Sequence, residues 1–215
     1  MPDILQSMIV SGRFVEFFLL FIGVPIVLIC TEDIFPLIPT ILILLGGVIV
    51  MMRRTGWSYR ELLIVGKWRS WRNMLLVFLG SALFWIGVVY LWQPENLFSF
   101  ALQRPDVWIL VMFLYPIMSA LPQEILYRTF LWHRYADLFN HNQWLLIGVS
   151  AFVFMWGHLM FMNLFALTIT LLGGLTFAWR YYHTRSLLLV AVEHGLYGNL
   201  FFSVGLGQYL FSGAV

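Results

Sequence analysis

A small set of ionisable and amide side chains lies within long apolar segments of this 215-residue chain. The set falls on three separate segments and consists of Gln123, Glu124 and Arg128, then His158, then His194 and Asn199. A carboxylate and imidazoles are the groups that bind a metal ion or orient a water molecule for hydrolysis. Because a charge buried in hydrocarbon costs at least about 2.5 kcal/mol, these residues are candidates for function until each is paired.

A structural role is the alternative for each of these residues taken singly. Glu124 and Arg128 lie one helical turn apart, so they share a face and can neutralise each other. A lone histidine in a membrane helix is usually a hydrogen-bonded packing residue. Two histidines and a carboxylate on three helices are harder to explain in this way, because the cores of helix bundles build metal and water sites from such groups on facing helices.

The composition of the chain fixes its class. Hydrophobic residues make up 61% of it, charged residues only 10%, and the mean hydropathy is +0.88. An average soluble domain carries about 25% charged residues, so a soluble globular enzyme is excluded. A net charge of only +2 argues against nucleic-acid binding. We expect one integral membrane domain over residues 1–215, an all-α polytopic bundle of about seven to eight transmembrane helices.

Seven apolar runs approach the length of about 20 residues that a bilayer requires. They cover residues 14–30, 37–52, 74–92, 107–130, 144–161, 163–180 and 187–204. With the N-terminus in the cytoplasm, eleven of the twelve Lys and Arg residues fall on the cytoplasmic side, and only Arg104 lies outside. Alternating aromatic and cationic residues over Trp57–Trp71 predict an interfacial helix at the inner leaflet, in contact with membrane lipid.

Residues of one site must lie at similar depths in the membrane. At 1.5 Å per residue, His158 lies roughly 21 Å and His194 roughly 12 Å from the cytoplasmic ends of their helices. Glu124 reaches a comparable depth, roughly 16 Å, only if its helix continues to Tyr135. The sequence therefore predicts a long fourth helix that projects past the membrane, with Arg134 and Asp137 at its exposed end.

At these residues the chain resembles the CPBP family of intramembrane proteases, which includes CAAX prenyl endopeptidases and bacteriocin-processing or immunity-associated proteins. The family pattern is Glu-Glu-x-x-x-Arg on one helix, Phe-x-x-x-His on the next helix, and His-x-x-x-Asn/Asp later in the chain. The residues that carry the resemblance are Gln123-Glu124-x-x-x-Arg128, Phe154-x-x-x-His158, and His194 with Asn199. The resemblance covers about residues 107–204.

The resemblance implies an intramembrane endopeptidase in a bacterial cytoplasmic membrane, acting on a peptide or membrane protein, either prenylated or bearing a leader peptide. In the family, the first glutamate and the Phe-x-x-x-His histidine activate a water, and the last histidine and Asn/Asp stabilise the oxyanion. Carried over, His158 orients the water, His194 is the oxyanion donor and Arg128 fixes Glu124. A divalent metal such as zinc is the implied cofactor, with Glu124, His158 and His194 as ligands.

Two departures from the pattern leave alternatives open. Gln123 stands where the family has its first glutamate, and an amide cannot serve as a general base. Either Glu124 takes over, or the chain is an inactive membrane scaffold or immunity-type protein. Asn199 follows His194 by five residues, which rotates it by about 140° on a regular helix, so Tyr197 is the alternative partner. A proton-linked transporter is a third possibility, disfavoured because the chain has no internal repeat.

Overall fold

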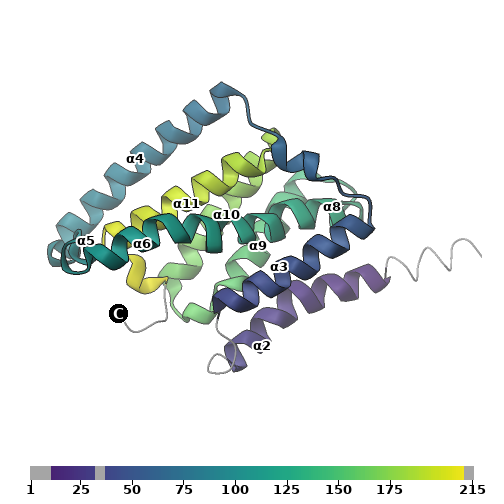
Figure 1. The fold of residues 1–215 in the computed structure, drawn as a ribbon, viewed down its shortest axis with the longest axis horizontal. Helices are drawn as coiled ribbons and strands as arrows, with labels where there is room; N and C mark the ends of the chain where they lie inside the picture. The colour runs from purple at the N-terminus through teal and green to yellow at the C-terminus, as the bar shows by residue number, and fades with distance from the viewer. Residues whose placement is uncertain (1–10, 32–36, 211–215) are drawn as a thin grey trace, which may run out of the picture.

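The computed structural model describes residues 11–31 and 37–210, and every regular element in those two ranges is a helix (Figure 1). Each of the seven predicted apolar runs forms a helix, as expected for segments that must satisfy every backbone group internally. Five helices are long and apolar enough to cross a membrane: Ser11–Cys30, Trp68–Trp92, Pro105–Phe139, Gln143–Phe161 and Leu164–Thr184. The predicted all-α polytopic bundle is therefore confirmed.

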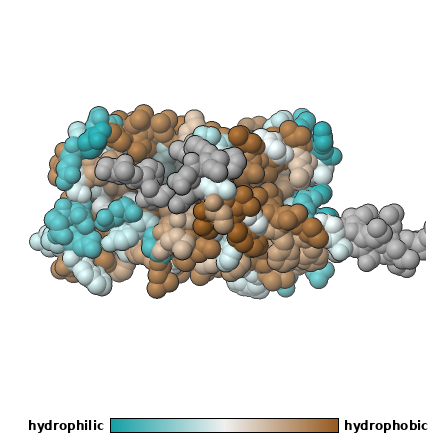
Figure 2. Space-filling model, turned by 90° about the horizontal axis from the view of Figure 1, so that it is seen from below, coloured by the Kyte–Doolittle hydropathy of each residue, from teal (hydrophilic) through white to brown (hydrophobic). Residues whose placement is uncertain are grey.

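The remaining two helices are α3 (Leu37–Arg54) and the shorter apolar helix α11 (Leu187–Ser203). Helix α4 (Trp68–Trp92) forms one edge of the bundle, and α2 (Val24–Cys30) and α3 lie at the opposite edge (Figure 1). Between them lie α9 (Gln143–Gly157), α10 (Leu164–Thr184) and α11. The face shown in Figure 2 is largely hydrophobic along its middle, with hydrophilic residues gathered toward both ends. This is the distribution of an integral membrane protein.

The fourth predicted span is one continuous helix of 35 residues, Pro105–Phe139, which confirms the predicted extension. It contains α6 (Pro105–Tyr115), α7 (Leu121–Glu124) and α8 (Leu131–Tyr135), separated by the π-helical turns η4 (Pro116–Ala120) and η5 (Ile125–Phe130). Pro116 and Pro122 have no N–H to donate, which weakens the regular hydrogen-bond ladder here. A π-turn changes the direction in which the following side chains point. The two turns bracket Gln123 and Glu124.

The projecting end of this helix is held to the first helix by ion pairs. The guanidinium of Arg134 donates to both carboxylate oxygens of Glu16, at 2.9 and 2.7 Å, and the hydroxyl of Tyr135 donates to the same group at 2.7 Å. Asp137 is exposed and pairs with Arg13. The first helix, although distant in sequence, is thereby fixed against the core.

The interfacial helix predicted over Trp57–Trp71 is wrong. Its middle is only a short 3-10 turn, η2 (Tyr59–Leu63), and α4 begins at Trp68. Trp57 is buried in the core, and the amide of Gly66 donates to the hydroxyl of Ser186 at the start of α11, 3.2 Å away. These tertiary contacts hold the segment in an irregular path that its own aromatic and cationic pattern does not reveal.

Candidate active site

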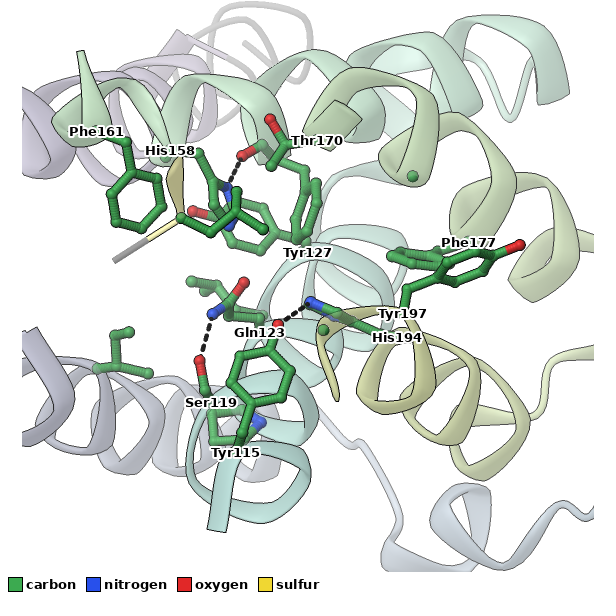
Figure 3. Close-up of a pocket in the computed structure, with 18 of the residues that line it drawn as sticks. Tyr115, Ser119, Gln123, Tyr127, His158, Phe161, Thr170, Phe177, His194 and Tyr197 are labelled. Atoms are coloured by element: carbon green, nitrogen blue, oxygen red, sulfur yellow. Dashed lines mark hydrogen bonds between the residues drawn. The ribbon is translucent and has the colours of Figure 1, made fainter. Parts of the chain in front are cut away.

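A large cavity of about 960 Å³ lies within the bundle, lined by residues of the first helix, α3, α4, the long helix, α9, α10 and α11. Its lining is mostly apolar. Polar side chains that line it near one another are Tyr115, Ser119, Gln123, His158 and His194 (Figure 3). Three of these five residues belong to the set singled out from the sequence. Tyr115 and Ser119 were not predicted.

The neighbouring residues Gln123 and Glu124 face different surroundings. Gln123 lines the cavity, and its carboxamide lies between His158 and Tyr115 (Figure 3). Its Nε2 donates to the hydroxyl of Ser119 at 2.9 Å, while its buried Oε1 has no hydrogen-bond partner among the described residues. Glu124 is fully buried and does not line the cavity. Of these two residues, only Gln123 lines the cavity, and its side chain is a neutral amide.

Glu124 is held by two groups in the packed interior. Its Oε1 lies 2.9 Å from Nδ1 of His194, and its Oε2 lies 3.2 Å from Nε of Arg128, the ion pair predicted from the one-turn spacing. The Nε–H of Arg128 is not aimed at the carboxylate, so this contact is an ion pair without a well-formed hydrogen bond. The Arg128 guanidinium also donates to the hydroxyl of Ser150 at 2.6 Å. Both charges of the pair are therefore fully enclosed by protein.

His158 is anchored by one ring nitrogen and has the other free. It is the C-terminal cap of α9, and its Nδ1 lies 2.7 Å from the carbonyl oxygen of Phe154. A carbonyl only accepts, so Nδ1 carries the hydrogen and Nε2 carries a lone pair. Within the described part of the chain no group bonds to Nε2. His158 therefore presents an unoccupied acceptor to the cavity.

His194 has both ring nitrogens occupied. Besides its contact with Glu124, its Nε2 lies 3.1 Å from the hydroxyl of Tyr115, and its ring stacks on Phe177 with centroids 5.0 Å apart. Both ring nitrogens of His194 are thus engaged within the protein. The role of oxyanion donor, which the resemblance implies for His194, stays a prediction.

Neither predicted partner contacts the His194 ring. The carboxamide of Asn199 donates to the carbonyl of Met112 at 2.9 Å, as expected from its rotation on a regular helix. The hydroxyl of Tyr197 pairs with Ser81 of α4 at 3.2 Å. The neighbour that reaches His194 is Tyr115. Sequence offers one signal for it, a glycine at position 198, one turn after His194.

Comparison with known proteins assigns the segment that carries these residues. Residues 105–200 match the family model described as type II CAAX prenyl endopeptidase Rce1-like. This segment is Rce1-like. The match confirms the resemblance found in the sequence, and the Rce1-like segment contains every polar residue of the cavity wall named above. Searches of curated proteins and of solved structures returned no match. The first helix, α3 and α4 lie outside the matched segment, although all three line the cavity.

The arrangement within the Rce1-like segment does not fit the predicted metal site. No three His, Cys, Asp or Glu side chains of the described residues are grouped so as to hold a metal ion. Of the three predicted ligands, Glu124 and His194 already bind each other and a further side chain each. Only His158 has a free nitrogen facing the cavity. We therefore derive no chemical step through a metal.

A second buried ion pair lies beside this site. Nε and Nη2 of Arg180 both donate to the carboxylate of Glu193, with Nη2 2.8 Å from Oε1. The pair joins α10 to α11, and Glu193 directly precedes His194. Its pairing was not predicted from the sequence. It fixes the two helices against each other at the level of the site.

Proposed function

We propose that this protein is an intramembrane endopeptidase of the CAAX-protease type in which His158, and not Glu124, activates the water. The observation that carries the proposal is the free Nε2 of His158 at the cavity, together with the neighbouring Gln123, whose buried Oε1 is the second acceptor without a partner among the described residues. Membership of the matched segment in the Rce1-like family supports a protease. Glu124 is unsuited to the role of base because its oxygens are enclosed and paired.

A water molecule has two hydrogens, and the two acceptors can take one each. The water then points a lone pair at a peptide carbonyl bound in the cavity. His158 takes the proton as the new C–O bond forms, and returns it to the leaving amine when the C–N bond breaks. Gln123 fulfils the hydrogen-bonding part of a glutamate's role without accepting the proton, so we expect a slower enzyme than one with a carboxylate there.

The oxyanion that forms in this step needs hydrogen-bond donors near the carbonyl. Gln123 donates one of its two amide hydrogens to Ser119, which leaves the second amide hydrogen and the Ser119 hydroxyl hydrogen to donate. In this proposal Glu124, Arg128 and His194 do not touch the substrate. They hold the long helix and α11 in register around the cavity.

The substrate proposed from the cavity is an apolar or prenylated peptide, or the leader peptide of a membrane protein. The lining is mostly apolar, and a volume of about 960 Å³ is large enough for several side chains or a lipid chain. We place the N-terminus in the cytoplasm, as the distribution of basic residues predicts, and the protein in a bacterial cytoplasmic membrane, as the resemblance implies.

The test is peptide cleavage by purified protein in lipid vesicles, with prenylated and leader peptides as substrates. His158→Gln removes the proposed base, and His183→Gln is a matched control. The His183 ring contacts the carbonyl four residues earlier at 2.9 Å, as His158 does, but His183 does not line the cavity. We expect His158→Gln to lower the rate by about 100-fold or more and His183→Gln to leave it unchanged. Equal rates would contradict the proposal.

A second candidate is a non-catalytic member of the family that binds the same peptides. The observation that favours it is the absence of any Asp or Glu among the described residues that line the cavity. This candidate predicts that wild-type protein binds a fluorescent prenylated peptide without cleaving it, and that His158→Gln binds it equally well. Turnover that depends on His158 would exclude it.

A further inference from the structure

Position 198 of α11 lies one helical turn after His194, on the side of the helix that faces the cavity. The residue there is Gly198, so the helix offers His194 no side-chain partner from this position. The next residue, Asn199, does not supply this partner either, because its carboxamide donates to the carbonyl of Met112.

The ring of Tyr115 occupies the space beside Gly198. A Cβ atom built on Gly198 would lie 2.0 Å from Cε1 of Tyr115 and 2.6 Å from its hydroxyl oxygen, closer than real Cβ atoms approach. Any side chain at position 198 would therefore expel the tyrosine. Tyr115 can take this position only because residue 198 is a glycine and has no side chain.

The end of α6 approaches α11 at two glycines, which explains how Tyr115 reaches so far. One turn before Gly198, a Cβ on Gly195 would lie 3.0 Å from Pro116, the residue after Tyr115. The tyrosine ring also packs edge-on against Phe202 at 5.4 Å. Its hydroxyl then lies 3.1 Å from Nε2 of His194. The tyrosine is thus held at both its backbone and its ring.

We infer that Tyr115, which enters from another helix through the space that Gly198 leaves, positions His194. With Glu124 on Nδ1 and Tyr115 on Nε2, the His194 ring is held in one orientation and has no free nitrogen to compete for the water. The inference rests on the proposed function only in assigning that water to His158. The contact between Tyr115 and His194 can be tested without any activity.

The experiment compares Tyr115→Phe with Tyr197→Phe by nitrogen NMR of histidine-labelled protein, with the His194 signals assigned from a His194→Gln variant. Tyr115→Phe keeps the ring and removes only the hydroxyl. Tyr197→Phe removes a hydroxyl from the same cavity that bonds to Ser81 instead. We expect the Nε2 signal of His194 to shift only in Tyr115→Phe, and peptide cleavage in that variant to fall about tenfold through kcat. An unchanged Nε2 signal would overturn the inference, whether or not the protein cleaves peptides.

Substitutions at positions 198 and 115 test whether the space beside Gly198 is what lets Tyr115 reach His194. Gly198→Asn alone should lower the unfolding temperature, because the amide meets the ring of Tyr115. Tyr115→Ala alone should lose the contact. In the double variant the asparagine has room one turn from His194, and we expect both the unfolding temperature and the His194 Nε2 signal to move back toward wild type. A double variant less stable than both single variants would contradict the inference.

Discussion

Gln123 and Glu124 are adjacent in sequence and differ by one atom, yet the structure treats them differently. The amide faces an apolar cavity with one oxygen unpaired, and the carboxylate lies in the packed interior between Arg128 and His194. The buried carboxylate of Glu124 is suited to a structural role, because a charge in the protein interior is stable only beside a cation and a hydrogen-bond donor. In the proposed mechanism, the chemistry in the cavity is carried out by neutral groups.

The largest expected effect on stability comes from removing the buried carboxylate of Glu124. Glu124→Ala leaves the fully buried guanidinium of Arg128 without its counter-charge, and we expect a loss of about 3–5 kcal/mol of unfolding free energy. Asp106→Ala is the control, since that carboxylate lies on the same long helix but is 72% exposed and should change stability by less than about 0.5 kcal/mol. Unfolding in mixed detergent measures both. Equal stability of the two variants would show that Arg128 needs no carboxylate.

The pair between Arg180 and Glu193 should behave in the same way across two helices. Glu193→Leu or Arg180→Met alone should each cost roughly 3 kcal/mol, because one buried charge is left unpaired. The double variant removes both charges and should be more stable than either single variant. Unfolding measurements on all four proteins give the coupling energy. Additive losses would show that the two side chains do not depend on each other.

The substitution Gln123→Glu tests whether the side chain at position 123 contacts the water in the cavity. A carboxylate there can both accept the water's hydrogen and take its proton, so we expect peptide cleavage to rise about tenfold. The same change buries a charge with no cation beside it, and stability should fall. Cleavage rates and unfolding are measured on one preparation, with Gln123→Ala as the control that removes the acceptor. A rate equal to that of Gln123→Ala would mean that this side chain does not touch the water.

The smallest effect is expected from metal removal. Because the described residues group no three ligands, treatment with a chelator should change the cleavage rate by less than about twofold. Peptide cleavage before and after dialysis against the chelator measures this. A large loss that added zinc restores would instead support the metal site predicted from the sequence.

The sequence was sufficient for the elements of the fold. Hydrophobic length alone located the helices, and the requirement for a common depth predicted the long helix through Tyr135. It failed at residues 57–71, where a buried Trp57 and a backbone contact to Ser186 override local pattern. Such contacts join residues that are far apart in sequence, so no local periodicity reveals them.

The candidate site was predictable in its members but not in their directions. Glu124, Arg128 and His194 do converge, and His158 lines the same cavity. Which of Gln123 and Glu124 faces the cavity depends on the rotation of the helix, and the π-turns on either side change that rotation. Tyr115 could not be identified from spacing, because its contact with His194 requires the close approach of two helices at Gly198.

The central claim is that His158 is the base and Glu124 is not. The most direct measurement is the rate of peptide cleavage by His158→Gln and by Glu124→Gln, each divided by the fraction of protein that remains folded. Glu124→Gln keeps an acceptor for His194, so we expect its corrected rate to stay within about tenfold of wild type, while that of His158→Gln falls by about 100-fold or more. The opposite order, with Glu124→Gln inactive and His158→Gln active, would contradict the account.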